Sequence, residues 1–91
     1  MSAKQIFKKL GYRKIVVKED VLFVYERPSD IEGYVECIYF DGILRQFMAN
    51  EVSKEDGDDI SSKYLSLEEL EAINLQITEL GWSDSNGIYR R

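Results

Sequence analysis

The strongest constraint on the fold lies between residues 13 and 49, where β-branched and aromatic residues form four runs separated by turn residues. These runs predict strands at Arg13 to Lys18, Val21 to Arg27, Tyr34 to Asp41 and Ile43 to Ala49. Pro28 ends the second run, because proline cannot donate a hydrogen bond to a strand ladder. We therefore expect a four-stranded, mostly antiparallel sheet.

The dipeptide Asp41-Gly42 predicts a tight hairpin, since both central positions of such a turn need positive φ. A two-residue loop pairs Phe40 with Ile43 and Cys37 with Gln46. One sheet face then carries no charge; its residues are Val35, Cys37, Tyr39, Leu44, Gln46 and Met48. We assign this face to the core, because burying an unpaired charge is costly. A loop one residue longer would reverse the assignment for one strand.

The opposite face is mixed, and its residues are Tyr34, Glu36, Ile38, Phe40, Ile43, Arg45 and Phe47. This face is too apolar to leave wholly in water, yet Glu36 and Arg45 argue against full burial. We predict a protein-interaction or self-association surface here, made of Tyr34, Ile38, Phe40, Arg45 and Phe47. Two alternatives remain open: one helix covers each face, or the C-terminal tail folds across this one.

Helices are predicted on both sides of the strand region. Ser2 can cap a first helix whose apolar face is Ala3, Ile6, Phe7 and Leu10, and Gly11 closes it. Ser66 and Glu69 form a capping box for a second helix, which Gly81 ends. Residues 50–63 predict an acidic connection too polar to pack.

The order of elements is thus α-β-β-β-β-α, an α+β fold. We expect one domain over residues 1–82 and a tail over residues 83–91, with a turn at Asn86-Gly87 and a short strand at Ile88 and Tyr89.

The two helices also carry a resemblance. The first ends in Leu10, Gly11 and Tyr12, and the second carries Leu67, Leu70, Ala72, Ile73, Ile77, Glu79, Leu80, Gly81 and Trp82. In these positions the chain resembles small uncharacterised proteins encoded in phages and prophages of Gram-positive bacteria. The resemblance covers both ends of the chain and implies a genomic setting. It supplies no catalytic motif.

Composition excludes several kinds of chemistry. The 91 residues include no histidine and a single cysteine, which excludes Ser-His-Asp and Cys-His sites and multi-thiolate metal centres. An EF-hand that began at Asp56 would have Ile60 at its fifth position and Ser61 in place of the required glycine. Cys37 is expected to be a small buried hydrophobe. We predict no enzyme activity, catalytic residue, metal or cofactor.

Charge is distributed unevenly along the chain, whose net charge is -5. Residues 1–18 carry six basic and no acidic side chains, whereas residues 51–91 carry four basic and ten acidic ones. An alternative function is therefore nucleic-acid binding through Lys4, Lys8, Lys9 and Lys14. A third possibility is an acidic decoy that occupies a nucleic-acid-binding protein. We expect a cytoplasmic protein that does not contact a membrane, because charges interrupt every apolar run.

Overall fold

The computed structural model describes residues 1–19, 21–57 and 60–82. Along the chain the elements are α1 (Ala3–Lys9), β1 (Arg13–Lys18), β2 (Leu22–Pro28), β3 (Tyr34–Asp41), β4 (Gln46–Ser53), β5 (Ile60–Ser62) and α2 (Leu67–Glu79). The α+β class and the two terminal helices agree with the sequence analysis. The expected tail, with its Asn86-Gly87 turn, lies outside the described residues.

The five strands form one antiparallel sheet in the order β1-β2-β3-β4-β5. The predicted number of strands, four, is wrong. β4 continues to Ser53, and residues 60–62, which were assigned to an acidic connection, pair with β4 as β5. These segments are polar, so their strand structure depends on pairing with a neighbour and carries little local signal.

The β3–β4 hairpin also differs from the prediction. Asp41 pairs with Gln46, so the loop has four residues, Gly42 to Arg45. The Asp41 carboxylate accepts hydrogen bonds from the backbone N–H groups of Ile43 and Leu44, and Arg45 adopts a φ of 53°. Aspartate favours such a turn through these side-chain bonds. Phe40 therefore pairs with Phe47, four residues beyond the predicted partner. An even shift leaves the residues of β3 and β4 on the faces that were predicted for them, whereas Ile43, Leu44 and Arg45 lie in the loop.

Both helices begin and end as the sequence predicts. Ser2 and Ser66 each complete a capping box, with Gln5 and Glu69 respectively. Gly11 and Gly81 follow the helices with φ values of 94° and 78°, the left-handed conformation that glycine adopts readily.

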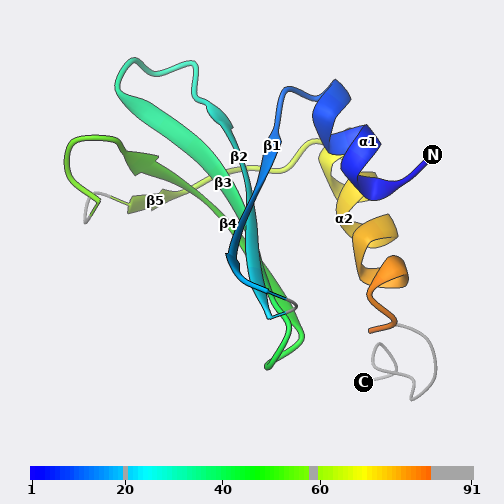
Figure 1. Ribbon diagram of the computed structural model, residues 1–91. Helices are drawn as coiled ribbons and strands as arrows, with labels where there is room; N and C mark the ends of the chain where they lie inside the picture. The colour runs from blue at the N-terminus through cyan, green and yellow to red at the C-terminus, as the bar shows by residue number, and fades with distance from the viewer. Residues whose placement is uncertain (20, 58–59, 83–91) are drawn as a thin grey trace.

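Both helices lie on the same face of the sheet (Figure 1). The core between them and the sheet contains Ala3, Phe7, Tyr12, Phe23, Tyr25, Ile38, Phe40, Ala72, Ile73, Ile77 and Trp82. Phe7 of α1 stacks on Tyr25 of β2 with ring centroids 3.9 Å apart. The Tyr25 hydroxyl donates a 2.6 Å hydrogen bond to Gln76 of α2. Among the described residues, the sheet therefore has one face covered by helices and one face, here called the open face, that no helix covers. The alternative in which the tail folds across the sheet lies outside the described residues.

The predicted choice of core face is wrong. The helices cover the mixed face, with Ile38 and Phe40, and leave the uncharged face, with Cys37 and Tyr39, without a helix. The alternative of one helix on each face is likewise not observed. Within the described ranges, none of the helices is long and apolar enough to cross a membrane.

Candidate interaction surface

The open face is the side of the sheet opposite the helices. Alternation along each strand places every second side chain here. Two registered rows form its centre: Arg13, Glu26, Cys37, Asn50 and Ser62, and next to them Ile15, Val24, Tyr39 and Met48. A third row, towards the β2–β3 connection, contains Pro28, Val35, Val52 and Ile60. Most of these side chains are apolar, and they extend across all five strands.

The side chains of the open face differ in how far they are exposed. Val24 and Cys37 are buried although no described helix covers them, so their strand neighbours provide the shielding. Met48 is 58% exposed and Ile60 is 55% exposed. A shallow pocket of about 200 Å³ lies near the end of β3, lined by Leu22, Tyr39, Asp41, Gln46, Phe47 and Met48. The face therefore offers apolar contact area and a depression.

Four charged side chains lie on this face: Arg13, Lys18, Glu26 and Asp41. Arg13 and Glu26 form an ion pair with atoms 3.2 Å apart, and the Arg13 side chain is 76% exposed. Asp41 is engaged in the hairpin loop. Burial raises the pKa of the Cys37 thiol, which keeps the thiol protonated and unreactive at neutral pH. Cys37 is therefore not an activated nucleophile on this face.

Asn50 lies in the central row beside Cys37. It is a buried residue, and its Oδ1 accepts no hydrogen bond from any residue that the structure describes. An unsatisfied buried acceptor costs about 1–3 kcal/mol. Buried acceptors of this kind in native folds are commonly satisfied by an ordered water.

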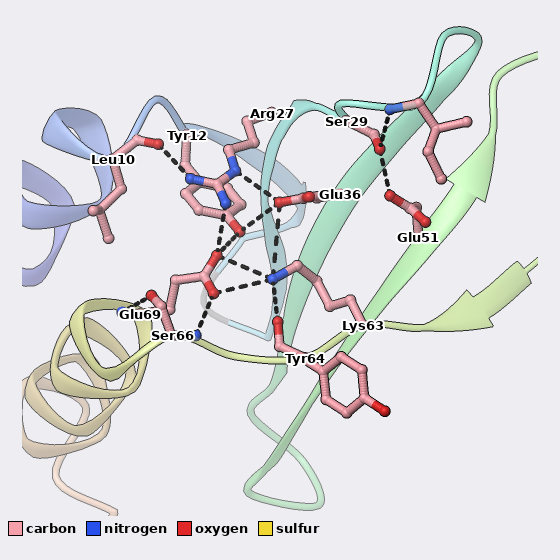
Figure 2. A network of polar contacts seen from close by, with 11 residues as sticks. Leu10, Tyr12, Arg27, Ser29, Glu36, Glu51, Lys63, Tyr64, Ser66 and Glu69 are labelled. Carbon is pink, nitrogen blue, oxygen red and sulfur yellow. Dashed lines mark hydrogen bonds and ion pairs between the residues drawn. The ribbon is translucent and has the colours of Figure 1, made fainter.

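A polar network pairs the charges of the mixed face where the helices cover it (Figure 2). The Arg27 guanidinium lies 2.7 Å from Glu36 and 3.1 Å from Glu69. The Lys63 ammonium lies 3.0 Å from Glu69 and 3.8 Å from Glu36. The Tyr12 hydroxyl donates to Glu69. Two cations thus neutralise two carboxylates between the sheet and α2, so Glu36 is not an unpaired charge.

The network also shifts proton affinities. Burial alone would raise the pKa of Glu69, but hydrogen bonds from Tyr12, the Ser66 backbone and Lys63 outweigh it and lower that pKa. Burial, reinforced by Glu69, raises the pKa of the Tyr12 hydroxyl. Each group is therefore held in its ordinary charge state at neutral pH, as expected of a structural anchor.

The five residues predicted to bind a partner do not share one accessible surface. Ile38 and Phe40 are fully buried under the helices. Tyr34 is half-buried at the start of β3, Arg45 lies in the hairpin loop, and Phe47 is 37% exposed. The sequence analysis identified the β3 and β4 residues of the open face as the uncharged face. It could not show that Glu36, on the other face, forms ion pairs with Arg27 and Lys63.

The lysines of the nucleic-acid alternative are separated into two groups. Lys4, Lys8 and Lys9 are exposed on α1. Lys14 is also exposed, and its ammonium lies 4.3 Å from the centre of the Phe23 ring. The lysines of α1 therefore remain accessible to phosphates, and Lys14 is engaged in a cation–π contact.

Among the residues that the structure describes, no group of three or more histidine, cysteine, aspartate or glutamate side chains could hold a metal ion. Asp58 of the rejected EF-hand lies outside those residues. Comparison of the chain with protein-family models, with curated proteins and with solved structures found no match.

Proposed function

We propose that this protein is a non-enzymatic protein-interaction module of phage or prophage type, and that it binds through the open face of its sheet. The observation that carries the proposal is an apolar row on that face, Ile15, Val24, Tyr39 and Met48, which no described helix covers. The phage setting is supported by the resemblance of the two helices.

The open face has the composition of an interaction surface. Apolar side chains form two of its rows, and a mostly polar row that contains Arg13, Glu26, Asn50 and Ser62 lies between them. Protein interfaces typically combine apolar contacts with polar groups that form hydrogen bonds. Antiparallel sheets that face water usually carry polar residues on the exposed side, whereas Met48 and Ile60 are large apolar side chains exposed there.

The proposal is tested by replacing one exposed apolar residue on the open face and one elsewhere. Met48→Glu introduces a charge among apolar neighbours. Leu44→Glu introduces the same charge in the hairpin loop, where Leu44 is 65% exposed. Both variants are expected to fold, as judged by circular dichroism. We expect a partner captured from Gram-positive bacterial extract to be retained by the wild type and by Leu44→Glu and lost by Met48→Glu.

Equal retention of every captured protein by Met48→Glu and by the wild type would contradict the open face as the binding site. Capture of nucleic acid in place of protein would favour the alternative below.

The exposed lysines of α1 support a second candidate, nucleic-acid binding. It predicts retention on DNA or RNA that weakens steeply as salt rises, because bound phosphates release counterions. Lys4→Ala, Lys8→Ala and Lys9→Ala together would abolish this retention. Absence of retention at low salt in the wild type eliminates the candidate.

A further inference from the structure

We infer that the outer edge of β4 from Gln46 to Ala49, here called the free edge, binds an extended segment of a partner protein by strand addition. The inference goes beyond the proposed function, because it concerns main-chain groups at one edge of the sheet and holds whether or not the open face binds. Its starting observation is that β4 extends beyond β5. β4 spans Gln46–Ser53, but β5 pairs only with residues 50–52 (Figure 1).

The register of the sheet shows which main-chain groups lie along the free edge. The backbone N–H of Lys54 donates to Gly33, the residue opposite it where the β3–β4 ladder continues. In an antiparallel ladder such a residue directs both main-chain groups to the strand opposite, and its neighbours direct theirs the other way. The β3–β4 register has no shift. Counting back from Lys54, Met48 therefore bonds to β3, and Phe47 and Ala49 direct their groups outward.

These outward groups have no partner among the described residues. No such residue bonds to the N–H or C=O of Phe47 or to the N–H of Ala49. The free edge is also accessible: Phe47 is 37% and Met48 58% exposed, whereas Asn50, beside β5, is 8% exposed. Unpaired main-chain groups at strand spacing fit the backbone of one more strand, which is the basis of strand addition at a sheet edge.

The free edge lacks the features that commonly prevent a sheet edge from pairing. Charged side chains, prolines, bulges and short strands are the usual protections. The β1 edge carries Arg13, Lys14 and Lys18 and a register shift, and β5 is only three residues long. The free edge has the sequence Gln-Phe-Met-Ala, with no charge, no proline and no register shift. The outer edges of the sheet are thus protected, and the free edge is left competent to pair.

The side chains around the free edge indicate the chemistry of the partner segment. Phe47 lies on the helix-covered face beside Phe40, and Met48 lies on the open face beside Tyr39. Successive side chains of an added strand therefore contact an apolar neighbour on each face. Arg45 directly precedes the free edge; it is exposed and forms no ion pair with a described residue. The segment that fits is extended and apolar, with a carboxylate at the end beside Arg45.

Amide hydrogen exchange of the purified full chain tests the state of the free edge. The Phe47 N–H points outward, so it should exchange at least about 10-fold faster than the Met48 N–H, which bonds to β3. Equal protection of the two amides in the chain alone would show that the edge is already paired and would overturn the inference.

The peptide acetyl-Thr-Val-Thr-Val-Thr-Asp is the probe for binding, followed by NMR of the full chain at millimolar peptide. We expect shifts and slower exchange at Phe47 and Ala49. Methylating the backbone nitrogens of one alternate set of peptide residues should weaken binding at least about 10-fold, because it removes donors to the edge. Methylating the other set, whose N–H groups point away, should have little effect.

The position of the carboxylate is tested on the chain. Arg45→Glu should weaken binding of the peptide by roughly 2- to 5-fold, as expected for an exposed charge pair. Arg13→Glu, an equally drastic charge change at the β1 edge, is the matched control and should leave peptide binding unchanged.

Absence of any shift at Phe47 with millimolar peptide overturns the inference, as does equal binding of the two methylated peptides. Protection of Phe47 that rises with the concentration of the chain alone would make a second copy the occupant and also overturn it. In each case, loss of a captured protein by Met48→Glu would still support the open face. Conversely, peptide binding at Phe47 together with capture that Met48→Glu leaves unchanged would support the inference and contradict the proposed function.

Discussion

Paired ionised residues allow the mixed face of this sheet to be buried. Glu36 and Glu69 each lie within 4 Å of both Arg27 and Lys63, and the Lys63 side chain is only 7% exposed. A buried charge is tolerated when it is paired and hydrogen-bonded. Removing one member of such a set leaves an uncompensated charge in a poorly solvated position, which costs more than the pair contributes.

Lys63→Ala is therefore expected to lower the free energy of unfolding by about 3 kcal/mol, because Glu69 loses its closest buried cation. Urea unfolding at neutral pH measures this change. Arg13→Ala is the matched control: it removes an exposed ion pair and should cost about 0–1 kcal/mol. Equal effects of the two substitutions would show that the network does not stabilise the fold.

Acid should weaken the same network. The pKa of Glu69 is lower in the folded chain than its ordinary value of 4.5. The unfolded chain thus binds a proton first as the pH falls. The stabilisation is complete above about pH 4.5 and is lost as the pH drops through the folded pKa. The difference in unfolding free energy between the wild type and Glu69→Gln should shrink from about pH 7 to pH 3. A constant difference across that range would contradict this assignment.

At the scale of the element, signals that act within a few residues predicted the structure well. The strands Arg13–Lys18 and Tyr34–Asp41 were predicted with the bounds observed. The capping box at Ser66 and the left-handed glycine at position 81 place α2. β5 was missed, because Ile60–Ser62 carries only one apolar residue and becomes a strand by pairing with β4. Its structure is determined by the neighbour and could not be read from its own residues.

The β3–β4 loop was also predicted only in part. Asp41-Gly42 indicated a turn, but the length of the loop depends on how β3 and β4 pair. Asp41→Ala removes the acceptor for the Ile43 and Leu44 amides and should cost about 1 kcal/mol. Asp30→Ala, in the exposed β2–β3 connection, is the control and should be nearly neutral. Urea unfolding of both variants is the measurement. A neutral Asp41→Ala would mean that the loop does not depend on this carboxylate.

At the scale of the whole molecule, the candidate surface could be predicted only in part. The sequence separated the two faces of β3 and β4 correctly, but it could not show which face the helices cover. Burial of Glu36 on the covered face is possible because Arg27 and Lys63 pair with it; they lie 9 and 27 positions from Glu36 in the sequence and meet it only in the folded chain. The expectation that a face with charged residues stays exposed fails when residues distant in the sequence form ion pairs with those charges.

The single cysteine offers a test of the open face that needs no substitution on that face. Cys37 lies on β3 and is buried among its strand neighbours. Its reaction with a thiol reagent requires a local opening, and a protein bound over the face would have to leave first. We therefore expect a partner captured by the wild type to slow the reaction of Cys37, because binding protects the covered state. In Met48→Glu the same partner should not change the rate. A Cys37→Ser chain that carries Leu44→Cys provides an exposed thiol off the face, which should react equally fast with and without the partner. If the partner binds while the Cys37 rate stays constant, it binds through another surface.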